Sequence, residues 1–178
     1  MNEEPDKKRP DALWRLSKWL LDERRSTGDL ARLRRMNPRN PETAFDVLHH
    51  VLGEHALHSS LVRLQRWALI VHCLALAGGR HRKGASGFGR VLVDIHYGEL
   101  RLRQLLRADL EVLLDVLPRV ARRISAKSLE ANWSSITKLV LNVPPDDKKA
   151  KPDEADDARR EIARDFVIAS NAEQAAAS

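Results

Sequence analysis

The chain has 178 residues, 43% of them hydrophobic, and a single cysteine, Cys73, so it can bury a helical core but can form neither an internal disulfide nor a multi-cysteine metal site. The first ten residues lack the apolar centre of a secretion signal, and the longest apolar run, residues 67–77, is too short to span a bilayer, so we expect a cytoplasmic chain. The net charge is +6, but residues 1–141 carry +9 and residues 142–178 carry −3, which favours an anionic partner such as nucleic acid or an acidic protein surface.

The first predicted helix covers residues 11–25 and follows a disordered start at residues 1–10. Its leucines recur at helical spacing behind Asp11, which can cap the helix. A short second helix begins at Asp29 and carries the basic run ARLRRM. The asparagines and prolines at residues 37–41 then predict a loop.

Two further helices are predicted before a glycine-rich segment. The first covers residues 42–52 and places its larger apolar residues on one side. The second covers residues 61–77 and is apolar over much of its surface, as expected of a central helix in a bundle. Gly78 and Gly79 end it.

The segment GGRHRKGASGFGR, at residues 78–90, holds five of the eight glycines and four basic residues. It lacks the glycine-lysine-serine/threonine order of a P-loop, so it does not predict nucleotide binding of that kind. Two interpretations stay open. One is a flexible surface loop, and the other is a loop that becomes ordered on a polyanion or on a partner subunit.

The second half begins with a leucine-rich block at residues 102–106 and a helix at residues 109–117. Pro118 then starts or kinks the next helix, because proline is tolerated in a first helical turn. A further helix is predicted at residues 128–141, where the apolar residues again follow helical spacing.

The charged, proline-containing stretch at residues 142–157 predicts a flexible linker. Beyond it, apolar residues at helical spacing predict a last helix at residues 158–169, followed by a disordered tail at residues 171–178. No strand pattern and no internal repeat is present in the sequence. We therefore predict an all-α fold of about eight helices in two small bundles, residues 11–88 and residues 89–170.

A group of four histidines, His49, His50, His55 and His58, is the strongest indication of an enzyme. His55 and His58 could share a helical face, but no glutamate lies between two histidines as it does in zinc proteases. A solvated, histidine-rich helix end explains the group more simply. No glycine-flanked serine and no isolated carboxylate pair is present either. We expect no catalytic residue, no metal and no cofactor.

Five segments share an order and spacing with a known family. They are GDLARLRRMNP (residues 28–38), LVRLQRWALIVHCLAL (61–76), GRVLVDIHYGELRLRQLLRAD (89–109), NW (132–133) and ARDFV (163–167). Together they resemble the CasB family, the small subunit of type I-E CRISPR Cascade complexes, over most of the chain. The resemblance implies an all-helical protein of two small bundles with no catalytic centre.

The resemblance also implies partners. Two copies of the subunit would lie along the inner face of Cascade, beside the CasC backbone that holds the guide RNA, with the large CasA subunit at one end. The implied task is to help hold the unwound target DNA, and contacts with the nucleic-acid backbone suffice for it because the exchange of a DNA duplex for an RNA–DNA hybrid is nearly balanced in free energy. We expect no membrane partner and no small-molecule substrate.

The resemblance singles out five arginines as candidate nucleic-acid contacts. Arg34 and Arg35 match a basic pair in the short second helix of the family, and Arg32 belongs to the same run. Arg101 and Arg107 match basic positions of the family's central motif. Guanidinium groups suit this task, because they are permanently charged and can meet phosphate oxygens in bidentate fashion.

Three more candidates follow from spacing alone. Arg119, Arg122 and Arg123 lie at i, i+3 and i+4, which places three guanidinium groups on one helical stripe. Ion pairing within the chain is the alternative for such residues, for example between Arg101 and Glu99 or between Arg107 and Asp109. That alternative stays open on sequence grounds.

The four tryptophans, Trp14, Trp19, Trp67 and Trp133, fall on helical positions that we expect to face the core. Binding should therefore be electrostatic rather than driven by base stacking, and it should weaken steeply with salt. Two other functions remain as hypotheses. One is a helical scaffold whose arginines meet only an acidic protein, and the other is a metalloenzyme that depends on the histidines.

Overall fold

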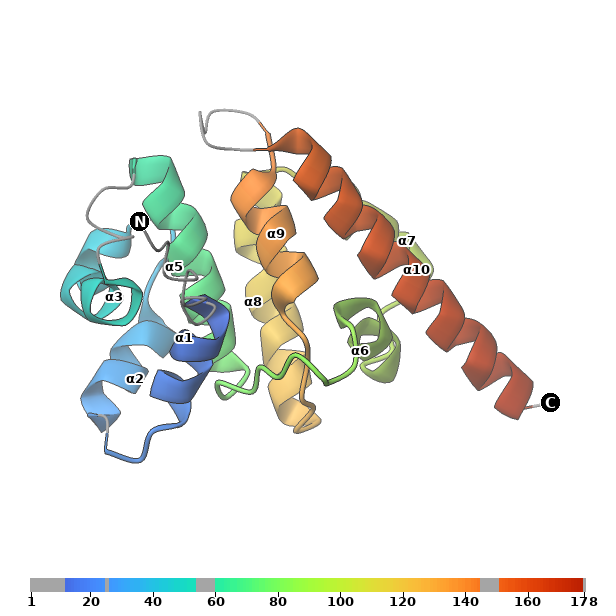
Figure 1. The fold of residues 1–178 in the computed structure, drawn as a ribbon, viewed down its shortest axis with the longest axis horizontal. Helices are drawn as coiled ribbons and strands as arrows, with labels where there is room; N and C mark the ends of the chain where they lie inside the picture. The colour runs from blue at the N-terminus through green and yellow to red at the C-terminus, as the bar shows by residue number, and fades with distance from the viewer. Residues whose placement is uncertain (1–11, 25, 54–59, 145–150, 178) are drawn as a thin grey trace, which may run out of the picture.

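The computed structural model describes residues 12–24, 26–53, 60–144 and 151–177. It confirms the all-α fold, since these residues form nine α-helices and one 3-10 helix, close to the eight helices expected, with only two isolated bridging residue pairs of β type. In chain order the elements are α1 (Ala12–Leu21), α2 (Thr27–Arg35), η1 (Pro41–Ala44), α3 (Phe45–Leu52), α5 (Leu61–Leu76), α6 (Phe88–Asp94), α7 (Glu99–Arg107), α8 (Leu110–Ala126), α9 (Ser134–Asn142) and α10 (Pro152–Ala176) (Figure 1).

Helix α5 has the central place that its apolar sequence predicted. Ser60 caps its first turn by accepting a hydrogen bond from the Arg63 amide at 3.2 Å. From Ala68 to Ala75 every residue of the helix is buried, because α2, α8 and α9 pack around it. Figure 1 shows α5 between the N-terminal helices and the pair formed by α8 and α9.

The N-terminal helix α1 ends at Leu21, earlier than predicted, and buries a stripe of leucines against the neighbouring helices. Leu13, Leu16 and Leu20 are at most 4% exposed. The side chain of Ser17 lies on the same stripe and donates a hydrogen bond to the Gly79 carbonyl at 2.6 Å. This contact joins α1 to the end of α5.

One expectation about the tryptophans was wrong. Trp133 is 2% exposed, and Trp19 and Trp67 are partly buried against the core. Trp14, in contrast, is 47% exposed. It follows Leu13 directly, so it points about 100° away from that residue round the helix and falls off the buried stripe.

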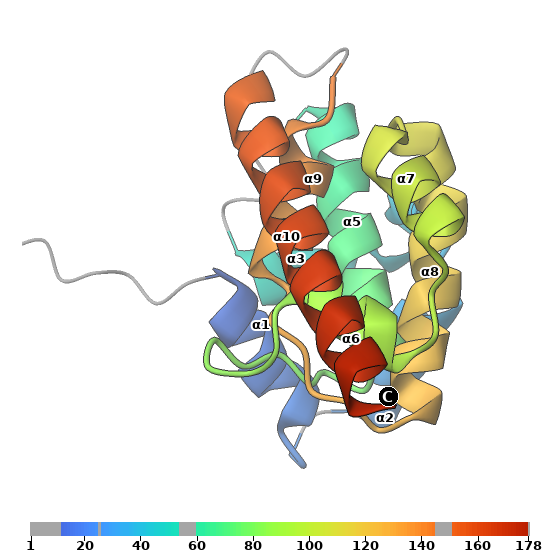
Figure 2. The same ribbon diagram turned by 90° about the vertical axis from the view of Figure 1, so that its right-hand side faces the viewer.

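Helix α10 crosses α6 at very close range, and Figure 2 shows the two helices side by side in the front of the molecule. Gly89 makes this approach possible. A Cβ atom at this position would lie 2.1 Å from the Ile162 carbonyl oxygen and 2.6 Å from the Phe166 amide nitrogen. Backbone meets backbone here, so no side chain larger than hydrogen fits without separating the helices.

Helix α10 corrects two boundaries of the prediction. Residues 152–157, which we assigned to a flexible linker, form its first turns, and residues 171–176, which we assigned to a disordered tail, form its last. Pro152 suits a first helical position and the acids Asp153 and Glu154 favour the positive end of the helix dipole. The acidic residues that indicated a linker therefore form the start of a helix.

The segment between α5 and α6 has a defined course. Gly78 and Gly79 adopt positive φ angles of 79° and 74°, which turn the chain out of α5. The Arg80 guanidinium donates to the Ser128 carbonyl at 2.8 Å, and the Arg82 amide donates to the Ala131 carbonyl at 3.3 Å. These bonds attach the glycine-rich segment to the chain between α8 and α9.

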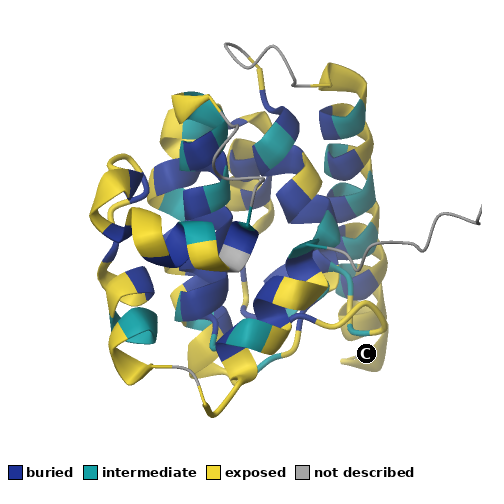
Figure 3. Cartoon of the chain, turned by 60° about the vertical axis from the view of Figure 1, so that its left-hand side comes forward, coloured by how far each residue is buried: buried dark blue, intermediate teal, exposed yellow. Residues whose placement is uncertain are grey.

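Buried apolar side chains form one cluster that draws on both halves of the described chain. Figure 3 colours all buried residues dark blue. The division into bundles at residue 88 therefore stays a prediction. The expected disordered start at residues 1–10 and the middle of the expected linker, residues 145–150, lie outside the described residues. None of the described helices combines the length and the apolar character that crossing a membrane requires.

Candidate nucleic-acid interface

Arg32, on α2, forms an ion pair with Asp46 on α3. Its two Nη atoms each lie 2.7 Å from a carboxylate oxygen of Asp46 on α3, and one of them also donates to the Thr43 carbonyl at 3.3 Å. The hydrogen bonds from Arg32 lower the pKa of Asp46. A bidentate pair of this kind ties α2 to α3, so Arg32 serves the fold.

Arg34 and Arg35 lie at the exposed C-terminal end of α2. The Nε of Arg34 donates to the Ala75 carbonyl near the end of α5 at 3.0 Å. This bond uses the inner nitrogen of the guanidinium group and orients its two terminal nitrogens. Within the described part of the chain neither arginine has a carboxylate partner.

The three arginines of α8 do not act as one stripe. Arg123 is half-buried and donates to the carbonyls of Ile95, at close range, and His96, at 3.4 Å. It therefore holds the connection between α6 and α7. Arg119 and Arg122 are exposed, and among the described residues neither has an acidic partner.

Arg34 and Arg122 both lie near the C-terminal half of α5. Burial lowers the pKa of His72 and raises that of the Cys73 thiol, and the charge of Arg122 lowers both. Both groups belong to the C-terminal half of α5, whose end also accepts the hydrogen bond from Arg34. We call the exposed guanidinium groups of Arg34, Arg35, Arg119 and Arg122 the arginine surface.

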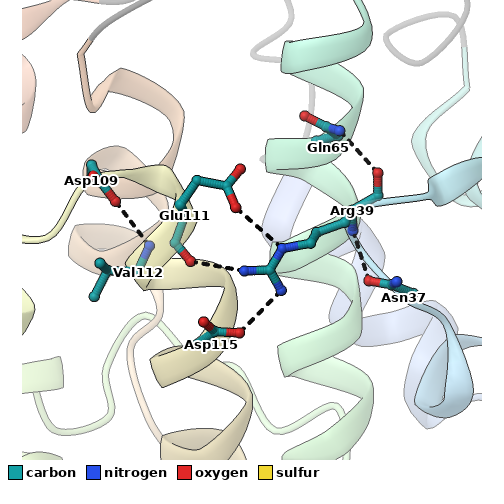
Figure 4. A network of polar contacts seen from close by, with 7 residues as sticks. All are labelled: Asn37, Arg39, Gln65, Asp109, Glu111, Val112 and Asp115. Atoms are coloured by element: carbon teal, nitrogen blue, oxygen red, sulfur yellow. Dashed lines mark hydrogen bonds and ion pairs between the residues drawn. The ribbon is translucent and has the colours of Figure 1, made fainter.

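Arg39, which the sequence analysis did not single out, connects the loop after α2 to α8 (Figure 4). Its guanidinium group lies 3.2 Å from a carboxylate oxygen of Glu111 and 3.0 Å from one of Asp115, and it donates to the Glu111 carbonyl at 3.2 Å. Hydrogen bonds to Asp115 and then to Glu111 raise the pKa of Arg39. On the other side, Gln65 of α5 donates to the Arg39 carbonyl at 3.0 Å.

The pairing of Arg39 with Glu111 and Asp115 determines which part of α8 carries net positive charge. Glu111, Asp115, Arg119 and Arg122 fall within an arc of about 80° on the helix surface, so they share one face. Arg39 neutralises much of the charge of the two acids at the N-terminal end of that face. The two arginines toward its C-terminal end are left as net positive charge on the helix that packs against α5.

Helix α7 carries the last two candidates. Arg101 and Arg107 are exposed, and the ion pairs considered for them are replaced by others, since Glu99 pairs with Arg103 at 2.5 Å and Asp109 caps α8 through the Val112 amide at 2.9 Å. Figure 2 shows α7 and α8 along the same edge of the molecule.

The two arginines of α7 lie near different parts of α8. The charges of Arg101 and Arg123 both act on Tyr97, lowering its pKa against the larger effect of burial, so Arg101 lies near the C-terminal half of α8. Arg107, at the end of α7, lies near the start of α8 instead. The structure thus places Arg101 near Arg123, which is not part of the arginine surface, and places Arg107 toward the start of α8.

His72 holds α2 against α5 and so positions two residues of the arginine surface. Its ring is 4% exposed, and Nδ1 donates to the Leu33 carbonyl at 2.8 Å. Burial lowers the pKa of His72, the hydrogen bond to Leu33 raises it in part, and the charge of Arg122 lowers it further. The neutral ring is therefore the form that the folded protein favours.

We expect the free energy of unfolding to decrease as the pH falls below 6.5, because the unfolded chain then binds a proton at His72 that the folded chain does not. The decrease continues down to the lowered pKa of the folded state. It amounts to about 1.4 kcal/mol for each pH unit that separates the pKa values of His72 in the unfolded and folded chains. Urea unfolding of wild type and His72→Gln between pH 7.5 and 5.0 checks this. The wild type should lose more stability than the variant, and parallel pH profiles would contradict the assignment.

The histidine group is only partly visible. His49 and His50 lie on α3, whereas His55 and His58 lie outside the described residues. In the described ranges, no three histidine, cysteine or acidic side chains are close enough together to hold a metal ion. The hypothesis of a metalloenzyme gains no support from these residues.

Comparison with known proteins identifies a family whose sequence profile matches this chain. The sequence profile described as CRISPR-associated protein Cse2 matches residues 29–166, which is more than half of the chain. A chain in the crystal structure of E. coli Cascade bound to a PAM-containing dsDNA target is similar in fold, with a TM-score of 0.60 and 20% identity over 90% of this chain and 97% of that one. No curated protein sequence matches. The extent of the profile match shows that this chain belongs to the CRISPR-associated Cse2 family, also named CasB.

Proposed function

We propose that this protein is the non-catalytic small subunit of a Cascade-type CRISPR surveillance complex, and that its arginine surface binds nucleic-acid backbone without reading bases. The family supports the first part of the proposal, and the fold shared with a chain of E. coli Cascade agrees with it. The second part depends on the arginines of α2 and α8. In this proposal the subunit stabilises the R-loop formed by guide RNA and target DNA.

One observation supports backbone binding above the others. Arg34 and Arg122 both lie near the C-terminal half of α5, Arg35 and Arg119 are exposed on the same two helices, α2 and α8, and none of the four has a carboxylate partner among the described residues. Arg32, Arg39 and Arg103, in contrast, are paired with acids. We infer that these guanidinium groups, on two helices that both pack against α5, form a site for phosphates, because each keeps several donors for phosphate oxygens.

The energetic role of such a surface is modest but sufficient. An RNA–DNA hybrid is about as stable as the DNA duplex that it replaces, so a few protein contacts with the backbone decide whether the target stays open. Contacts with phosphate carry no sequence information, which suits a complex that must accept any guide. We accordingly propose guide RNA and target DNA as partners.

The remaining partners follow from the same proposal. The similar chain comes from a complex described as bound to a PAM-containing dsDNA target, which supports a place beside nucleic acid. We propose that a second copy of this chain, the CasC backbone and the large CasA subunit surround it there. This arrangement assigns DNA cleavage to another protein.

A pair of double variants with equal loss of charge tests the arginine surface. Replacing Arg35 and Arg122 by alanine should weaken target binding by the assembled complex at least about tenfold, because two phosphate contacts are lost. The control removes Arg160 and Arg164, which are exposed on α10 and lie 3.3 Å and 3.7 Å from the carboxylates of Asp157 and Asp165. Filter binding with labelled target DNA measures both, and the control should stay close to wild type.

The competing hypothesis of a protein-only scaffold predicts a different pattern. If the arginines meet an acidic subunit, the Arg35 and Arg122 variant should fail to copurify with the complex after nuclease treatment. On our proposal it assembles normally and loses only DNA. Equal DNA affinity of the two double variants would remove the arginine surface from the proposal.

A further inference from the structure

A second basic feature lies on a different part of the molecule, between α1 and the glycine-rich segment. It is a pocket of about 990 Å³ that opens to solvent. Trp14, Lys18 and Leu21 of α1 line one side, and Arg80, Arg82 and Lys83 of the glycine-rich segment line the other. None of the arginines proposed for backbone binding belongs to this set.

The apolar wall of the pocket is unusual because it is exposed. Trp14 is 47% exposed and Leu21 is 53% exposed, although both lie next to well-buried positions of α1. The Nζ of Lys18 stands 5.6 Å from the centre of the Trp14 ring, within range of a cation–π contact. An indole left accessible beside a cation offers a flat apolar surface to a ligand that carries negative charge.

The opposite wall is basic. Arg80, Arg82 and Lys83 face two acids, Asp22 and Glu130, and with Lys18 they leave the pocket with an excess of positive charge. Arg82 lies 3.4 Å from Glu130 in an exposed pair, which contributes little stability and can exchange for another anion. Hydrogen bonds of the backbone already fix this segment, so the wall is formed before a ligand arrives.

We infer that this pocket holds one unstacked nucleotide of a single-stranded nucleic acid, with the base against Trp14 and the phosphate at Arg80 and Lys18. Aromatic surfaces combined with cationic grooves are how proteins bind single strands without sequence preference, since every base has a flat face. The volume also lies within the range of pockets that take small organic ligands. An acidic peptide would satisfy the cations but would leave the indole without a partner.

The inference rests on the proposed function, because an R-loop is what would present an unpaired strand to the protein. It adds a stacking contact to binding that is otherwise electrostatic. It also assigns phosphate binding to the basic glycine-rich segment.

Two ligands of equal charge test the pocket, using the full chain. A ten-residue thymidine oligonucleotide should bind roughly tenfold tighter than an abasic oligonucleotide of the same length, and it should quench tryptophan fluorescence. Trp14→Ala should abolish this difference and Trp14→Phe should keep part of it. Leu100→Ala, which removes an exposed apolar side chain outside the pocket, should leave it unchanged.

Each other outcome overturns the inference in a distinguishable way. Equal affinity of the wild type for both oligonucleotides would exclude base stacking but agree with backbone binding by the arginine surface. Failure to bind either one would contradict the proposed function as well. Binding of poly-glutamate that is lost in Arg80→Ala but kept in Trp14→Ala would assign the pocket to an acidic protein segment instead.

Discussion

Replacing Gly89 by alanine is expected to lower the free energy of unfolding by about 3 kcal/mol, at the upper end of the usual cost of overpacking. The added Cβ would lie 2.1 Å from the Ile162 carbonyl oxygen and 2.6 Å from the Phe166 amide, both of them backbone atoms that cannot rotate away. Helix α10 must then move off α6. In a chain of this size the loss corresponds to a decrease in Tm of roughly 6–12 °C, which thermal unfolding measures directly.

Gly84 offers the matched control. A Cβ atom there has no neighbour within 4 Å, so Gly84→Ala should change the stability by no more than about 0.5 kcal/mol. If Gly89→Ala melts within a few degrees of the wild type, the close packing of α6 and α10 is not present in solution.

Arg66 gives the second large effect, because it is a fully buried arginine that caps another helix. It is 0% exposed and donates to the carbonyls of Val140, at 2.8 Å, and Val143, at 2.6 Å, at the C-terminal end of α9. These carbonyls have no acceptor role within α9 itself, so they depend on an outside donor. Arg66→Met keeps most of the volume but cannot donate, and we expect it to cost about 3 kcal/mol through two buried carbonyls left without that donor.

Arg63 lies one turn earlier on α5 and donates to the Leu141 carbonyl at 2.8 Å from a partly exposed position. Water can replace its hydrogen bond, so Arg63→Met should cost only about 1 kcal/mol. Urea unfolding of both variants checks the comparison. Equal losses would mean that burial of Arg66 adds nothing to its hydrogen bonds.

The helical fold was predictable because its main signal is local. The apolar run at residues 61–77 became α5 (Leu61–Leu76) almost without change, and the spacing of leucines located α1. The predicted helix at residues 109–117 was too short, because α8 (Leu110–Ala126) continues through Pro118 instead of giving way to a new helix there. Composition was less reliable than spacing. Residues 152–157 are rich in acids and read as a linker, but the same acids stabilise the start of α10.

The site was only partly predictable, because the charge available at a surface depends on contacts between residues far apart in the chain. Arg32 and Arg123 match the pattern as well as Arg34 and Arg122 do, yet Arg32 pairs with Asp46 and Arg123 holds two carbonyls. Arg39 pairs with acids 72 and 76 positions away. Sequence spacing identifies which side of a helix an arginine occupies but not what it meets there.

Trp14 shows an error that spacing could have prevented. It lies one position after Leu13, and the buried stripe of α1 continues through Leu16, Ser17 and Leu20. A tryptophan off that stripe has to be exposed unless another element covers it. We assigned Trp14 to the core because large aromatic residues are usually buried, although the periodicity of α1 places it outside the buried stripe. For this reason the sequence analysis did not predict the pocket that Trp14 lines.

The salt dependence of target binding tests the central claim most directly, because each phosphate contact contributes its own share to the slope of log affinity against log salt. A complex with Arg34, Arg35, Arg119 and Arg122 all replaced by alanine should show a slope shallower by roughly 3, from about 0.7–0.9 per contact, and by the same amount for unrelated guide and target sequences. A slope identical to that of the wild-type complex would contradict the claim that these four guanidinium groups hold the nucleic-acid backbone.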